Sequence, residues 1–207
     1  MATKIIKIFI RAYLCKFNCD SEFNSEFNES VIERKLIDVN RIWQSAGIEW
    51  ELSSVEMLDV SALDINTFCY KDSKHLLRDS LVNVSPEIPE VLATRLWKVC
   101  FLRQFPASAG GVYLPETQTV FFSENNRKGN NSPAILAHEL GHSLGLIHCS
   151  DSGNLMNPEA LKNIHSLLNT KNNDALMFFT AEQIRSVNIQ AGSGPKKLAK
   201  AGLAYNS

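Results

Sequence analysis

The order of its predicted elements places this chain in the α+β class. Strand-like segments recur through residues 4–124, and the segments that follow have helical periodicity. With 207 residues, of which 44% are hydrophobic, the chain can bury roughly 70% of its unfolded surface. A single domain with a substantial core is therefore expected.

The chain opens with an apolar strand. Residues 4–14, KIIKIFIRAYL, are apolar on both alternations, which is typical of a strand buried on both faces of a sheet. A second strand is predicted over residues 48–58, IEWELSSVEML, because Ile48, Trp50 and Leu52 alternate with polar residues.

A helix is predicted between these two strands. Ser30 and Glu33 form an S-x-x-E capping box, and Gly47 is a stop signal. The apolar residues between these signals are spaced for one helical face and are Ile32, Leu36, Val39 and Trp43.

Three further strands are predicted before the chain becomes helical again. WKVCFLRQF (97–105) is followed by GVYL (111–114), which begins at the second of the paired glycines Gly110 and Gly111, and by TQTVFFSE (117–124). Pro115 separates the last two, and proline favours the edge of a sheet, so residues 117–124 are predicted as an edge strand. A short helix is also expected around residues 73–83.

Charge and composition exclude several classes of partner. The chain has 21 Lys and Arg against 22 Asp and Glu, and this balance offers no electrostatic surface for nucleic acid or anionic lipid. No apolar run is long enough to span a bilayer. We therefore expect neither a nucleic-acid partner nor a membrane partner.

Localisation is predicted from the first residues and the cysteines. Lys7 and Arg11 interrupt the first apolar segment, which makes it a poor signal peptide. The five cysteines lack the density of a disulfide-stapled secreted domain, which favours reduced thiols. We expect synthesis in the cytoplasm without a signal peptide. Leaderless export stays open, and the final site of action is not determined.

Residues 1–191 are expected to form the single domain. From Gly192 the segment GSGPKKLAKAGLAYNS loses its apolar periodicity. Residues 192–207 are therefore predicted to be a flexible basic tail.

Three of the chain's five histidines lie within HELGHSLGLIH, residues 138–148. Ser132 followed by Pro133 is a helix start, and Gly145 is well placed to end the same helix. His138 and His142 then lie one turn apart on one helical face, where two imidazoles can reach a single zinc ion.

A catalytic zinc site requires a third protein ligand and one open position. His148 supplies this ligand if Gly145 turns the chain in the left-handed conformation, which glycine adopts without a Cβ penalty. Glu139 projects about 100° away from His138, so it is not the natural third ligand. Its position suits a general base that takes a proton from water.

The motif HExxHxxGxxH, with Met156 eight residues further on in NLMNP, resembles the signature of the metzincin clan of zinc endopeptidases. The run HCSDSGNLMNP is most similar to the matrixin-like branch. The resemblance implies that His138, His142 and His148 ligate Zn²⁺. It also implies that Glu139 is the catalytic base and that Met156 lies in a tight turn beneath the metal.

The resemblance also implies a fold and a substrate surface. A metzincin-like zinc protease domain has a twisted, five-stranded mixed sheet over an active-site helix, with one antiparallel edge strand and a C-terminal helix. GVYLPETQTVFF is similar to the edge strand of that family. An extended peptide or protein substrate would pair with this strand, near residues 118–123.

The sequence therefore predicts a zinc-dependent endopeptidase, and two alternatives stay open. One is a catalytically silent zinc-binding interaction protein, which the presence of Glu139 disfavours because a structural site needs no base. The other is a toxin or effector protease that is delivered to another cell and restricted to one target protein. The sequence identifies neither a substrate nor a protein inhibitor.

Overall fold

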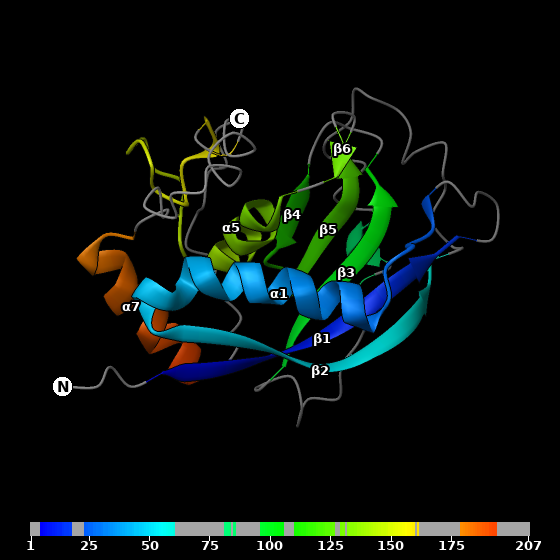
Figure 1. The fold of residues 1–207 in the computed structure, drawn as a ribbon, viewed down its shortest axis with the longest axis horizontal. Coiled ribbons are helices and arrows are strands. Elements are labelled where there is room, and N and C mark those ends of the chain that lie inside the picture. The colour runs from blue at the N-terminus through cyan, green and yellow to red at the C-terminus, as the bar shows by residue number, and fades with distance from the viewer. Residues whose placement is uncertain are drawn as a thin grey trace.

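The computed structural model describes residues 5–17, 23–60, 81–83, 85, 96–105, 110–126, 129–130, 132–159, 161 and 179–193. Figure 1 shows the arrangement of the elements, which are β1 (Ile6–Lys16), α1 (Glu29–Trp43), the 3-10 helix η2 (Gln44–Ala46), β2 (Ile48–Asp59), β3 (Leu96–Gln104), β4 (Gly111–Leu114), β5 (Thr119–Asn126), β6 (Gly129–Asn130), α5 (Pro133–Ser143) and α7 (Ala181–Ser193).

The five longer strands form one twisted mixed sheet in the order β2-β1-β3-β5-β4. β1 pairs in parallel with β2 and β3, and β3 pairs in parallel with β5. β4 runs antiparallel to β5 and forms one edge, while the two-residue β6 pairs with the end of β5. The predicted α+β class is confirmed, and so is a sheet of four parallel strands with one antiparallel edge strand.

The prediction of which segment forms the edge was wrong by one strand. Residues 119–126 form β5, which lies inside the sheet between β3 and β4. The edge is β4, on the other side of Pro115. Pro115 belongs to the turn that joins the two strands, in which Gln118 has a positive φ of 53°. Proline is as favourable in a turn as at an edge, so this signal did not distinguish the two places.

The two faces of the sheet are covered to different extents. Ile8 and Ile10 of β1 point into the larger hydrophobic cluster, whereas Tyr13 and Cys15 point into a smaller one on the other face. At the start of β1, however, Phe9 is 41% exposed. The predicted burial on both faces is therefore correct only for the second half of β1.

The cap of the first helix lies two residues before the predicted cap, at Asn28. The side-chain oxygen of Asn28 accepts hydrogen bonds from the Val31 backbone N–H (3.1 Å) and the Ser30 hydroxyl (2.8 Å). Ser30 thus lies inside α1, and the predicted capping box with Glu33 does not form. Asparagine caps helices as well as serine does, and Asn28 comes first in the chain. Gly47 follows η2 and ends this helical segment, with a φ of 69°.

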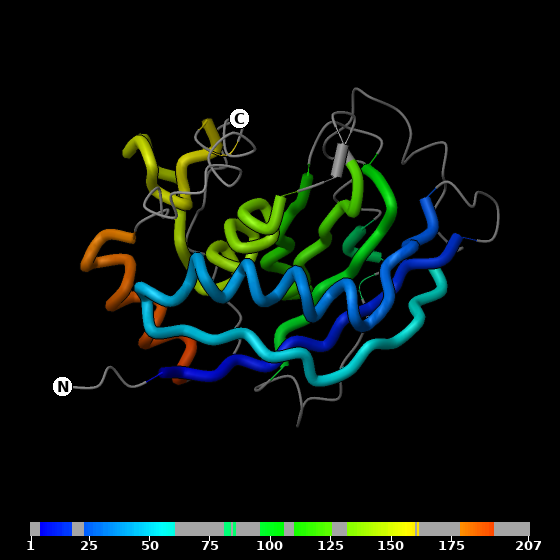
Figure 2. Tube along the Cα trace, viewed as in Figure 1, coloured from blue at the N-terminus to red at the C-terminus, as the bar shows by residue number. Residues whose placement is uncertain are grey.

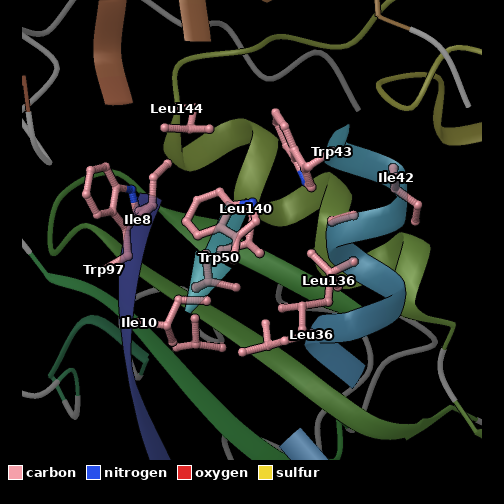
Figure 3. Close-up of a cluster of buried hydrophobic side chains, with 14 of the residues drawn as sticks. Ile8, Ile10, Leu36, Ile42, Trp43, Trp50, Trp97, Leu136, Leu140 and Leu144 are labelled. Atoms are coloured by element: carbon pink, nitrogen blue, oxygen red, sulfur yellow. The ribbon is translucent and has the colours of Figure 1, made fainter. Parts of the chain in front are cut away.

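α1 and α5 pack on the same face of the sheet and bury a single core between them (Figures 2 and 3). Leu36 of α1 and Leu140 of α5 both lie in this cluster, together with Trp50 of β2. Phe179, just before α7, lies against Trp43 with ring centroids 4.6 Å apart. This core packs α5 against the sheet and attaches the last helix to it.

The predicted C-terminal tail and the helix expected around residues 73–83 fall partly outside the described residues. α7 includes Gly192 and Ser193, so the helix continues past the predicted start of the tail, and residues 194–207 lie outside the described residues. Of the helix expected around 73–83, residues 81–83 are helical and the others lie outside the described residues. Within the described ranges, no helix combines the length and apolar character needed to cross a bilayer.

Candidate metal centre

The helix that carries the first two histidines is bounded by the predicted signals. The Ser132 hydroxyl accepts a hydrogen bond from the Ala134 N–H (3.2 Å), and Pro133 is the first helical residue. At the other end Gly145 has a φ of 85°. Its N–H donates to the His142 carbonyl (2.9 Å), and the next N–H, from Leu146, donates to the Gly141 carbonyl (3.0 Å). These two bonds form a Schellman motif, which turns the chain back toward the helix.

The turn at Gly145 brings His148 beside the two helical histidines. The Nε2 atom of His142 lies 3.0 Å from that of His138 and 3.1 Å from that of His148, and the remaining Nε2 pair is 3.2 Å apart. Nitrogen ligands about 2.0–2.1 Å from a tetrahedral zinc ion are about 3.3–3.4 Å from one another. The three atoms therefore have the spacing of a zinc-ligand set, and they are able to hold a metal ion together.

The other ring nitrogens orient the two buried imidazoles. The Nδ1 atoms of His138 and His142 each lie 2.8 Å from a backbone carbonyl oxygen, that of Leu155 and that of Leu146 respectively. A carbonyl only accepts, so each Nδ1 carries the proton and donates it. Each Nε2 is then left with its lone pair pointing toward the other histidines, as a metal ligand requires.

Burial keeps these histidines neutral. It lowers the pKa of His138 to about 4 and that of His142 to about 3, and it also lowers the pKa of the more exposed His148. The uncharged imidazole is the form that binds a metal. The three rings are thus available as ligands at neutral pH.

Glu139 lies beside the histidines and faces the edge strand. Its carboxylate accepts a hydrogen bond from the Tyr113 backbone N–H in β4. Burial raises the pKa of Glu139 to about 8, and the hydrogen bond from Tyr113 opposes this shift. A cation held by the histidines would oppose it as well, because a nearby positive charge favours the carboxylate. The three-histidine cluster does not include Glu139.

Met156 packs directly under the helix that carries the histidines. A Cβ added to Gly141 would lie 2.7 Å from the Met156 sulfur, so the methionine occupies the space that this glycine leaves. The Met156 N–H donates to the side-chain oxygen of Asn154 (2.9 Å), and its carbonyl accepts from the Cys149 N–H (3.1 Å). The residue predicted for the tight turn thus lies in a turn beside the cluster.

Sequence reasoning missed the side chains that hold this turn. Asn154 is fully buried, and its amide exchanges two hydrogen bonds with the amide of Gln183, of 2.8 and 3.3 Å. Gln183 also accepts from the Thr180 N–H (2.9 Å), while its own N–H donates to the Thr180 hydroxyl (3.1 Å). The T-x-x-Q capping box identifies Gln183 from the sequence, but nothing local indicates its contact with Asn154.

Comparisons with known proteins found similarity to one family model and to several solved structures. The family model of the matrixins, peptidase family M10, matches residues 95–182, which include the whole histidine cluster. A zinc-dependent peptidase from Methanocorpusculum labreanum is similar in structure, with a TM-score of 0.45 and 14% identity over 87% of this chain and 100% of that one. An archaemetzincin from Methanopyrus kandleri is similar with a TM-score of 0.46 and 16% identity, over 91% and 96% of the two chains. No curated protein matches the chain.

The family-model match and the histidine cluster support the same class of protein. The matched segment is similar to a peptidase family, and the cluster has the residues and spacing that zinc requires. These two features are those of a zinc metalloprotease, a hydrolase with Zn²⁺ as its cofactor.

Proposed function

We propose that the chain is a zinc-dependent endopeptidase of the metzincin type, from the matrixin-like branch. His138, His142 and His148 hold the metal, Glu139 is the general base, and Met156 supports the site from below. The observation that carries this proposal is three Nε2 atoms within 3.2 Å of one another, beside a buried carboxylate. A structural zinc site usually has four protein ligands and needs no base, so this arrangement favours catalysis over a scaffold.

Each residue has a separate task in peptide hydrolysis. Zinc bound to the histidines would polarise the scissile carbonyl and acidify the attacking water. Glu139 takes the proton from that water and then returns it to the leaving amine. The carbonyls of Leu155 and Leu146 keep the two helical imidazoles in one orientation, so that no reorganisation is required during the reaction.

The outer edge of β4 is the surface we propose for an extended substrate. The Ser123 N–H donates to the Gly110 carbonyl (2.9 Å), and Gly111 stands opposite Phe122. Hydrogen-bonded and non-hydrogen-bonded pairs alternate in an antiparallel ladder, so the backbone groups of Gly111 point away from β5. A peptide can add to the sheet there as a further strand. We therefore propose that a substrate pairs with β4 rather than with residues 118–123.

Cleavage-site profiling tests the proposal. Zinc-loaded protein is incubated with a proteome-derived peptide library, and new termini are identified by mass spectrometry. We expect cleavage at internal bonds, which a chelator stops and added zinc restores. The matched control is Glu139→Gln, which keeps the three ligands and should be inactive. Trimming confined to chain ends would contradict the endopeptidase assignment, and cleavage that persists in the control would contradict the role of Glu139.

A further inference from the structure

The catalytic base lies against the edge strand at a position without a side chain. A Cβ at Gly111 would lie 2.7 Å from Cγ of Glu139 and 3.3 Å from its Oε1. Carbon atoms in contact are normally about 3.5–4.0 Å apart, so any other residue at this position would displace Glu139. Gly111 therefore leaves the space that the glutamate occupies.

The same strand also holds the carboxylate. The Tyr113 N–H, two residues after Gly111, donates the hydrogen bond that Glu139 accepts. In an antiparallel strand, residues two positions apart have their backbone groups on the same side. The backbone groups of Tyr113, like those of Gly111, therefore point away from β5. Glu139 thus lies along the outer edge of β4, beside the backbone that we propose for substrate pairing.

The backbone conformation does not require glycine at this position. Among the described residues, the glycines with positive φ are Gly47, Gly145 and Gly153, and Gly111 is not one of them. A glycine inside a strand weakens the strand, because it has no side chain to pack and loses more conformational freedom on folding. Alanine would therefore be the better strand residue if Glu139 were absent.

We propose that Gly111 is a positioning residue for catalysis. Its missing side chain lets Glu139 lie against β4 and accept the Tyr113 N–H. This inference deepens the proposed function and rests on Glu139 being the base. A consequence is that one strand aligns both the base and the substrate, so their relative position is set by a single rigid element.

A double-mutant cycle in melting temperature tests the contact without reference to activity. In zinc-loaded protein, Gly111→Ala should lower Tm by a few degrees, because the new Cβ crowds Glu139. In a Glu139→Ala background, which lacks Cγ, the same substitution should leave Tm unchanged or raise it. The matched control is Val112→Ala, whose side chain packs on the opposite face of the sheet, and it should change Tm equally in both backgrounds. An equal loss from Gly111→Ala in both backgrounds would overturn the proposal.

Kinetics of the same variant test its effect on catalysis. Gly111→Ala should keep stoichiometric zinc and lose about 10²-fold in kcat, the order expected from displacing a reacting group by about 1 Å. KM should change much less. Loss of zinc, or a rise in KM with kcat unchanged, would overturn the positioning role. Full activity of Glu139→Gln would instead contradict the proposed function. The double-mutant cycle in Tm would still measure the contact between Gly111 and Glu139, so the two failures are distinguishable.

Discussion

Two adjacent residues, His138 and Glu139, have different environments because a helix turns successive side chains about 100° apart. The histidine ring points toward the other two imidazoles, and the glutamate points toward β4. One segment thus presents a metal ligand on one side and a carboxylate on the other. The roles that we propose for both residues depend on this separation.

Replacement of Glu139 by glutamine isolates the proposed base. The amide is nearly isosteric with the carboxylate but does not take up a proton at neutral pH. We expect kcat/KM to fall by at least about 10²–10⁴, because the same group serves as base and then as acid. Hydrolysis of a peptide that the parent cleaves, together with elemental analysis for zinc, provides the measurement. Loss of zinc in this variant would make Glu139 a ligand or a support of the metal.

His148→Ala tests the ligand that comes from outside the helix. Two histidines leave zinc with too few protein ligands, so the variant should lose zinc and almost all activity. Folding should survive, because His148 is exposed and lies outside the hydrophobic core. Zinc stoichiometry after dialysis against a weak chelator, with circular dichroism to check the fold, gives the readout. Stoichiometric zinc with normal turnover would remove His148 from the site.

Gly141→Ala should destabilise the protein although it improves helix propensity. Glycine in a helix interior normally costs about 1 kcal/mol relative to alanine. Here the added Cβ would lie 2.7 Å from the Met156 sulfur, and crowding in a packed core typically costs about 1–3 kcal/mol. Urea unfolding should report a net loss with Met156 present and a gain in a Met156→Ala background. Stabilisation with Met156 still in place would show that the methionine does not fill this space.

At the scale of elements, α7 is joined to the metal centre by one pair of amides. Gln183 of α7 bonds to Asn154, which also accepts the Met156 N–H, and the Leu155 carbonyl between them orients His138. A helix far along the chain therefore supports an imidazole on α5. This connection depends on hydrogen bonds of the Asn154 and Gln183 side chains and of the backbone between Asn154 and Met156, rather than on the hydrophobic core.

Gln183→Leu should loosen the turn that holds His138. The substitution leaves the buried side-chain NH2 group of Asn154 without the acceptor that Gln183 supplies, which costs about 1–3 kcal/mol. We also expect faster release of zinc to a chromogenic chelator, because the Leu155 carbonyl loses its support. Glu182→Ala is the control, since this neighbouring side chain is exposed on the same helix. Equal release rates for the two variants would contradict the proposed connection.

At the scale of the whole molecule, the metal should stabilise the folded state. The three histidines converge only after the turn at Gly145 has formed, so the unfolded chain offers no comparable site. At a zinc concentration about 100 times the dissociation constant, linkage contributes about 2.7 kcal/mol. For a chain of this size that corresponds to roughly 5–10 °C in Tm. Calorimetry with zinc and with chelator measures the shift, and a parent protein that shows none would contradict zinc binding to these residues.

The sequence by itself determined the features that depend on neighbouring residues. The histidine spacing, the start of the helix at Ser132 and Pro133, and the turn at Gly145 are local, because a helix and its caps involve residues only a few positions apart. The β2 and β3 strands were predicted for the same reason, from alternation and apolar content. These patterns predicted where the three histidines would meet.

Only the tertiary structure decided which strand forms the edge and what surrounds Glu139. β4 and β5 both have strand sequences, and their places depend on which of them pairs with the distant β3. Gly111, Tyr113 and Gln183 likewise acquire their contacts from residues more than 20 positions away. Hydrogen bonds and packing between such distant segments form only when the chain has folded, so no local pattern specifies them.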